Sequence, residues 1–205
     1  MLGLPEATAL KKVIPKKVFY AKFALNTAEQ IEFDNAIRQM AIVNEISSRT
    51  IPALSGKQGD KAIYVLWVQL KQSQCDEKII NKLARLIEQR IILALAYEDT
   101  LQLALFYNKL IKDERESAEK KRVPLKGLTL DDVWDNIALS LAEIEAEEGQ
   151  SADEAIKFKM KAEALQKEID ALTKKLWAEK QPRKKLALRE KINQLKCDMS
   201  SCNQR

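Results

Sequence analysis

The sequence predicts an α+β protein, in which a small, mainly antiparallel sheet packs with helices and a hairpin of two helices follows. Two observations predict the sheet. Residues 62–71 are an almost unbroken apolar run, the pattern of a central strand that is covered on both faces. Residues 90–97 and 100–107 are two more apolar runs joined only by Glu98-Asp99, which is the spacing of a β-hairpin. A third observation, an apolar seam beyond residue 150, predicts the helical hairpin.

Turn and cap residues indicate the elements of the N-terminal part. Residues 5–12 are expected to form a short helix that Pro15 stops. A second helix should begin at Asn26 or Thr27, with a capping-box partner two or three residues on, and run to about Arg38. Residues 40–46 are apolar and β-branched, so we expect a strand there.

Residues 16–23 interleave lysines with aromatic rings, and two interpretations are open. Such a segment can pair with phosphates and stack on bases. The spacing of Phe19 and Phe23 instead favours a helix that buries both rings while its lysines extend into water.

Further caps and one charged segment define the rest of the body. Asp76 should cap a helix that reaches about residue 89 and buries a stripe of isoleucines and leucines. Residues 112–122 are strongly charged and are expected to be a mobile loop. Thr129 and Asp132 should cap a further helix, which Gly149 ends.

The C-terminal part carries the apolar seam. Apolar residues recur at spacings of four and three, Pro182 interrupts them, and the same rhythm then resumes. The seam residues are Phe158, Ala162, Leu165, Ile169, Leu172 and Leu176 before the break, and Leu188, Ile192, Leu195 and Met199 after it. We therefore expect a globular domain over residues 1–149 and a helical hairpin arm with a frayed tail over 150–205.

Composition narrows the possible functions. The 205-residue chain contains no histidine, so catalysis and metal binding that need imidazole are excluded. It contains neither a glycine-rich phosphate loop nor an apolar run long enough to span a bilayer. Its three cysteines are scattered along the chain. We expect a cytoplasmic protein with no signal peptide, no cofactor, no metal and no membrane partner.

Charge is concentrated at the far end of the arm. The chain has a net charge of +5, but residues 174–196 alone hold nine cations and two acids, a net charge of +7. Such a segment favours an anionic partner, either an acidic protein surface or the phosphates of a nucleic acid, although exposed helices also carry charge without a partner. The candidate binding residues are Lys174, Lys175, Trp177, Lys180, Arg183, Lys184, Lys185 and Arg189.

One short motif has a possible catalytic meaning. Gln69 and Lys71 lie two residues apart at the end of the predicted central strand, so their side chains share one face. Metal-dependent nucleases place an acid and a lysine in this way, with a further acid that helps to hold Mg²⁺. Asp60 and Glu45 both qualify as the further acid, but Gln69 is a poor ligand for the ion. A strand that simply ends in polar residues is the commoner explanation.

Four segments resemble a bacterial family known only as domain of unknown function 4391. They are Leu4-Pro5 through Tyr20, Val68-Gln69-Leu70-Lys71, Leu128 to Val133, and Glu179 to Leu188. The family commonly has an acid at the position of Gln69 and an aromatic residue at that of Pro182, so this chain departs from the pattern twice. The resemblance implies a gene setting beside helicases and DNA methyltransferases in restriction or phage-defence clusters.

These expectations lead to one main hypothesis and two alternatives. The main one is a non-catalytic adaptor that binds a helicase or methyltransferase subunit through its basic arm, with DNA as a further candidate ligand of the arm. The alternatives are a divergent metal-dependent nuclease that uses Asp60, Gln69 and Lys71, and a protein that binds nucleic acid without sequence preference. An exposed seam could also pair two copies of the arm into a homodimer.

Overall fold

The computed structural model describes residues 2–54, 61–144 and 151–202, with only the backbone described for 199–202. The chain divides into two compact units, residues 1–145 and residues 146–205, called here the globular unit and the arm. The predicted boundary near Gly149 lies outside the described residues. Among the helices that the structure describes, none has the length and apolar composition needed to cross a membrane.

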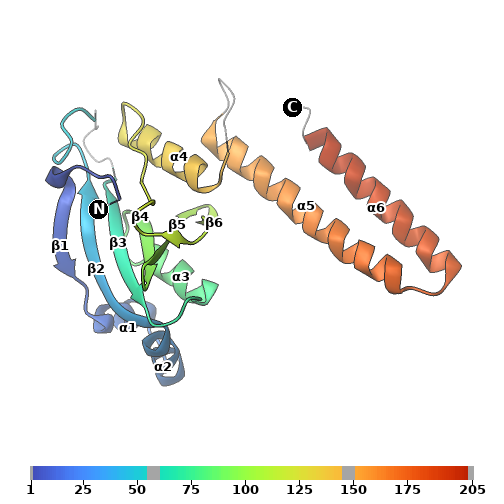
Figure 1. The fold of residues 1–205 in the computed structure, drawn as a ribbon, viewed down its shortest axis with the longest axis horizontal. Helices are drawn as coiled ribbons and strands as arrows, with labels where there is room; N and C mark the ends of the chain where they lie inside the picture. Colours follow the sequence, from blue (N-terminus) through green and yellow to red (C-terminus); the bar gives the residue numbers. More distant parts are fainter. Residues whose placement is uncertain (1, 55–60, 145–150, 203–205) are drawn as a thin grey trace. The chain divides into compact units, whose positions relative to one another are not determined.

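The globular unit is built on one seven-stranded sheet of described residues, in the order β1-β2-β3-β4-β5-β6, with β7 also paired to β5 (Figure 1). The strands are β1 (Ala9–Val13), β2 (Ile37–Ile46), β3 (Ile63–Leu70), β4 (Arg90–Tyr97), β5 (Thr100–Tyr107), β6 (Lys109–Lys112) and β7 (Glu116–Ser117). Only β3 and β4 run parallel, because α3 (Glu77–Ala84) returns the chain between them. The mainly antiparallel α+β fold is therefore confirmed.

Local sequence accounts for several of these elements. β4 and β5 form the predicted hairpin, in which Tyr97 pairs with Thr100 and Glu98 takes a left-handed φ of 49° in the turn. The Asp76 side chain accepts the Lys78 N–H at the start of α3. Thr129 and Asp132 form a reciprocal capping box at the start of α4 (Leu130–Leu141), as predicted.

The expected helix over residues 5–12 is wrong. Only Glu6–Thr8 form a single 3₁₀ turn (η1), and Ala9–Val13 pair with β2 as strand β1. The buried Asn44 amide donates to the Thr8 hydroxyl at 2.8 Å, which anchors the turn to the sheet. Pairing with a distant strand therefore prevails over local helix propensity.

Further predictions need correction. Helix α3 ends at Ala84 and not near residue 89, and α4 ends at Leu141 and does not extend to Gly149. Helix α2 (Thr27–Ala36) ends before Arg38, because Ile37 is fully buried and already pairs with Leu70 in the sheet. The charged segment 112–122 is not simply a loop, since β7 pairs with β5 and Lys121 is buried there. The Lys121 ammonium donates to Asp113 Oδ2 at 2.7 Å and to the Glu114 carbonyl at 2.6 Å, and this replaces the hydration that burial removes.

The main core lies between the sheet and helices α1 (Lys16–Phe23), α2 and α3. Phe19 of α1 stacks on Phe33 of α2 with ring centroids 4.2 Å apart, and both rings are almost completely buried. Leu93 and Leu95 of β4 belong to the same cluster. Phe23 is only partly buried but packs against the cluster, so burial of the rings of 16–23 in a helix accounts for this segment. Helix α4 packs against β5 and β6.

The arm consists of α5 (Ala152–Ala178) and α6 (Pro182–Cys202), so the chain breaks and resumes a helix at the predicted place. Pro182 is the first residue of α6, a position where its missing N–H costs no hydrogen bond. Three seam residues are buried between the helices, and three more are half-buried around them. The buried ones are Ile169, Leu172 and Ile192, and the half-buried ones are Leu176, Leu188 and Leu195.

Candidate binding site

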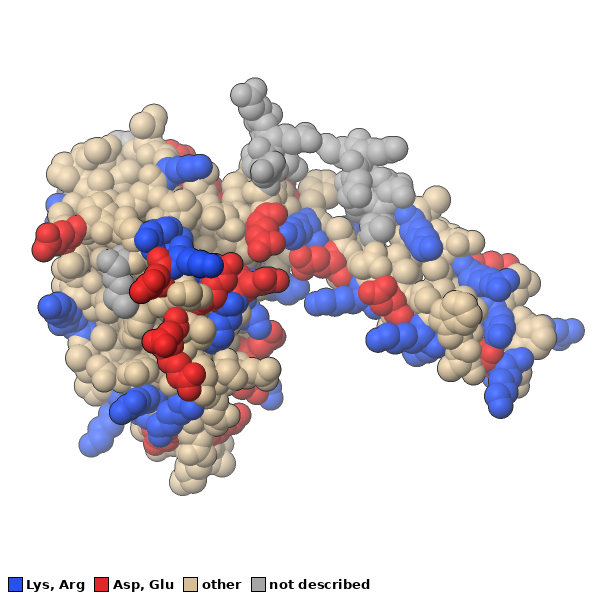
Figure 2. All heavy atoms as spheres, in the orientation of Figure 1, with Lys and Arg blue, Asp and Glu red and all other residues tan. Residues whose placement is uncertain are grey.

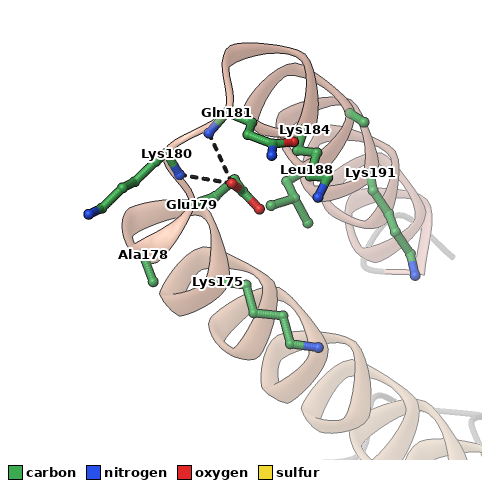
Figure 3. Close-up of a pocket in the computed structure, with 9 residues that line it drawn as sticks. Lys175, Ala178, Glu179, Lys180, Gln181, Lys184, Leu188 and Lys191 are labelled. Carbon is green, nitrogen blue, oxygen red and sulfur yellow. Dashed lines mark hydrogen bonds between the residues drawn. The ribbon is translucent and has the colours of Figure 1, made fainter.

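The turn at the tip of the arm is held by one acidic side chain. Glu179 Oε1 accepts the backbone N–H groups of Lys180 at 2.8 Å and of Gln181 at 2.9 Å (Figure 3). The Gln181 N–H makes the largest contribution to lowering the pKa of the Glu179 carboxyl below its usual value. The Glu179 N–H donates to the Lys175 carbonyl and closes α5. Glu179 therefore stays ionised and is engaged in the turn itself.

A hollow of about 770 Å³ lies between the end of α5 and the start of α6. Its lining combines short or apolar side chains with lysines. The lining residues are Lys175, Ala178, Glu179, Lys180, Gln181, Lys184, Ala187, Leu188 and Lys191. In Figure 3, Lys184 and Leu188 project from α6 toward Glu179, whereas the ammonium of Lys180 extends away from the turn. The hollow is thus apolar at its floor and cationic at its rim.

The cations of this hollow are largely unneutralised within the described residues. Lys191 lies 3.3 Å from Glu168, and both side chains are about half exposed. No ion pair joins Lys175, Lys180 or Lys184 to a described acid. Figure 2 shows Lys and Arg side chains outnumbering acidic ones over the far end of the arm. A carboxylate-bearing or phosphate-bearing partner would therefore meet free cations here.

Only some of the predicted arm residues line this hollow. Lys175, Lys180 and Lys184 do, whereas Lys174, Arg183, Lys185 and Arg189 lie on the same tip without lining it. The Trp177 side chain is 83% exposed and is also outside the lining. Sequence reasoning missed the floor residues Ala178 and Ala187, because alanines carry no charge and interrupt no apolar pattern. The sequence feature that could have predicted this floor is that two small residues flank the turn at a point where the seam has no large side chain.

A second hollow, of about 460 Å³, lies where β3 ends in the globular unit. It is lined by Arg38, Gln69, Leu70, Lys71, Tyr97 and Glu98. Gln69 pairs in register with Gln39 of β2 on one side and Ala96 of β4 on the other. The structure therefore places Gln69 and Lys71 at one site, as their spacing suggests, and adds Arg38 and Glu98 from other segments.

Of the two acids considered for a nuclease site, Glu45 is described by the structure and does not line this hollow. Asp60 lies outside the described residues, and β3 begins at Ile63, six residues or roughly 20 Å from Gln69. Glu45 pairs with Tyr64 near that same beginning of β3 and binds Arg49, so Glu45 as the further acid is wrong. Among the described residues no group of three or more acids and cysteines could hold a metal ion.

Asp34, whose carboxylate interacts electrostatically with Lys71, is already engaged by other groups. Asp34 Oδ1 accepts from the Lys16 ammonium at 2.7 Å and from the Tyr20 hydroxyl at 2.6 Å. The Lys16 hydrogen bond, followed by that of Tyr20, lowers the pKa of Asp34. Burial, followed by this bond to Asp34, raises the pKa of Tyr20 to about 12. Asp34 therefore ties α1 to α2 and is not available as a free ligand.

Comparison with known proteins gives one result. Neither the curated proteins nor the solved structures searched contain a significant match to the chain. The family model described as "Domain of unknown function (DUF4391)" matches residues 2–199 of the 205-residue chain. Because this match covers almost the entire sequence, the chain belongs to that family.

Proposed function

We propose that the protein is a non-catalytic adaptor that docks on a partner protein through the tip of its arm. The observation that carries this proposal is the tip hollow, in which unpaired lysines surround an apolar floor between two helices. Cationic side chains gathered at one turn attract a partner of opposite sign and set its orientation. The resemblance to proteins encoded beside helicases and methyltransferases makes a subunit of such a bacterial DNA-processing or phage-defence assembly the proposed partner.

The direct test compares full-length proteins that differ only at the tip. The protein is co-expressed with the helicase or methyltransferase encoded beside it and recovered by an affinity tag. Replacement of Arg183, Lys184 and Lys185 by Glu should abolish co-recovery, because it turns a cationic surface into an anionic one. A control replaces Lys161 and Lys167, two exposed lysines of α5 away from the tip, by Glu, so that two charges are reversed there against three at the tip. Equal loss in both variants, or loss in neither, would sink the proposal.

DNA is the second candidate partner, and the same cations favour it. If the tip binds phosphates, affinity should fall steeply as salt rises, because each neutralised phosphate releases counterions. Titration of a labelled duplex at increasing salt concentrations measures that slope. The tip variant should flatten the slope, while the Lys161 and Lys167 control should not. Binding that is independent of salt contradicts this candidate.

A divergent nuclease is the third candidate, favoured only by the hollow that holds Gln69, Lys71 and Arg38. Incubation with plasmid and Mg²⁺ or Mn²⁺ tests it, with Lys71→Ala as the comparison. This change keeps the backbone bond from the Lys71 N–H to the Ala36 carbonyl, so the strand end should persist. Absence of cleavage, or cleavage indifferent to Lys71→Ala, eliminates this candidate.

A further inference from the structure

We infer that the tip hollow binds an acidic amphipathic segment of the partner, which inserts an apolar side chain between α5 and α6 and places carboxylates on the lysine rim. This inference rests on the proposed docking function and specifies its chemistry. It is carried by two properties that occur together at one place: an unfilled apolar floor and an excess of cations around it.

The floor is open because the seam loses its large residues at the turn. Ile169, Leu172 and Ile192 fill the space between the helices further along the arm. At the tip, Ala178 and Ala187 are exposed and reach no further than Cβ. Leu188 is half-buried and forms the inner side of the hollow. A leucine or isoleucine from a partner would complete the seam in the way that the chain's own residues complete it elsewhere.

The lysines at the rim of the hollow favour a partner segment that carries negative charge. Lys175 of α5 and Lys184 and Lys191 of α6 lie on both sides of the floor. Lys191 forms an ion pair with Glu168, whereas Lys184 lies near the Glu179 carboxylate without forming an ion pair within the described residues. Glu179, the one acid of the lining, is engaged by two backbone N–H groups of the turn. Carboxylates flanking an apolar residue would therefore find complementary groups on both sides.

The same two properties separate a peptide from a nucleic acid. A phosphate backbone would satisfy the lysines, but it offers no aliphatic side chain to fill the floor. An acidic helix with leucines at spacings of three and four presents both kinds of group on one face. The observations therefore favour the peptide, and DNA becomes an outcome that the experiment can detect.

The experiment measures fluorescence anisotropy of three labelled probes with the full-length protein. The first probe is a peptide of about 20 residues with leucines at helical spacing between glutamates, and the second is polyglutamate of the same length. The third is a DNA duplex of about 20 base pairs. We expect the leucine-containing peptide to bind at least about tenfold more tightly than polyglutamate, because only it buries a side chain in the floor. Equal affinity for the two peptides, or tighter binding of the duplex, overturns the inference.

Variants of the hollow identify where the leucine advantage arises. Ala187→Gln should remove this advantage, because the longer side chain occupies the floor while glutamine remains a good helix former. Lys175→Gln with Lys184→Gln should weaken both peptides and leave their ratio unchanged. The control, Arg183→Glu with Arg189→Glu, changes tip cations that do not line the hollow and should also preserve the ratio. Circular dichroism confirms that each variant keeps its helices.

These variants also separate the inference from the docking function on which it rests. If the variant with Arg183, Lys184 and Lys185 replaced by Glu loses the cellular partner while Ala187→Gln retains it, the docking function is supported and the assignment of the apolar contact to the tip hollow is wrong. If neither variant loses the partner, the docking function itself fails. A leucine advantage that survives Ala187→Gln places the apolar contact elsewhere and also overturns the inference.

Discussion

The globular unit and the arm use apolar side chains in different ways. In the globular unit, strands and three helices enclose a large apolar cluster that includes Phe33, Leu66 and Leu93, and further buried residues line α4. In the arm, Ile169, Leu172 and Ile192 are the buried residues of the seam, and Ala152, Ala155 and Ile156 are buried near the start of α5. Most of each helix surface is therefore exposed to water. Two helices alone cannot enclose more than a narrow seam. The first unit therefore buries a broad apolar cluster, whereas the second buries a narrow seam and leaves most of its surface exposed.

Ion pairs show the same contrast. The Lys121 and Asp113 side chains are only 9% and 13% exposed, and further hydrogen bonds engage both. Burial raises the pKa of Asp113, although its bond to Lys121 opposes that shift. Lys191 and Glu168 in the arm are 59% and 47% exposed. The buried pair constrains the fold, whereas the exposed pair leaves its members accessible to a partner.

The largest expected effect comes from breaking the buried ion pair. Lys121→Ala should lower the free energy of unfolding by about 3–5 kcal/mol, because it leaves the Asp113 carboxylate buried without its counter-charge. The equivalent change in the arm, Lys191→Ala, should cost less than about 1 kcal/mol. Urea unfolding followed by circular dichroism measures both. Similar costs for the two changes would remove the contrast between the units.

The next effect concerns the seam of the arm. Ile169→Ala should destabilise the arm by about 2 kcal/mol, since it opens a cavity that only two helices can close. Helicity at 222 nm should fall, while the fluorescence of Trp67 and Trp134, measured in a Trp177→Phe background, reports separately on the globular unit. Leu186→Ala, at a residue 59% exposed, serves as the control and should change stability by less than about 0.5 kcal/mol. A matching shift in both signals would contradict the division into two units.

Helix caps allow a smaller comparison. Thr129→Ala removes an oxygen that accepts the Asp132 N–H at 3.1 Å within a capping box, and should cost about 1 kcal/mol. Ser151→Ala in the arm removes a longer bond, 3.3 Å from the Glu154 N–H, and should cost about 0.5 kcal/mol. Thermal melts of both variants test the order. A larger cost at Ser151 would show that the cap of α5 matters more than its geometry indicates.

The smallest effect depends on pH. Because the pKa of Asp34 is lowered, its ionised form stabilises the fold above the ordinary carboxyl pKa of 3.8, and this contribution is lost as pH falls through the lowered value. Asp34→Asn should therefore cost less than about 1 kcal/mol at neutral pH, since the Asp34 side chain is about half exposed. The difference from the wild type should disappear in acid. Unfolding curves across this range check it, and a difference that grows in acid would reverse the sign.

Prediction from sequence was most accurate where the signal is local. The Glu98-Asp99 turn, the Asp76 cap, the Thr129 capping box and the break before Pro182 all match the structure. Each depends on hydrogen bonds or backbone angles within a few residues. The expected helix over 5–12 failed because its residues are held by β2, more than 25 positions away in the chain.

The candidate sites divide in the same manner. Charge counting located the tip cations, because neighbouring residues in a helical turn stay neighbours in space. It did not reveal that Lys175 of α5 and Lys191 of α6 line the same hollow. Nor did it reveal that Ala178 and Ala187 form the floor of that hollow. It paired Lys71 with a distant acid and missed Arg38 and Glu98, which the sheet places beside it.

The sequence by itself determined the α+β class, the hairpin of two helices, the absence of imidazole chemistry and the basic character of the arm. These properties follow from residue type and short-range periodicity, which do not depend on contacts between residues far apart in the sequence. Only the tertiary structure decided that residues 9–13 become a strand, that β3 and β4 run parallel, and that Lys121 is buried with Asp113. It also decided the apolar floor at the tip of the arm. The physical reason is that strand pairing, desolvation and the closure of a hollow depend on residues far apart in the sequence. These residues come into contact, and contribute free energy to one another, only when the chain folds.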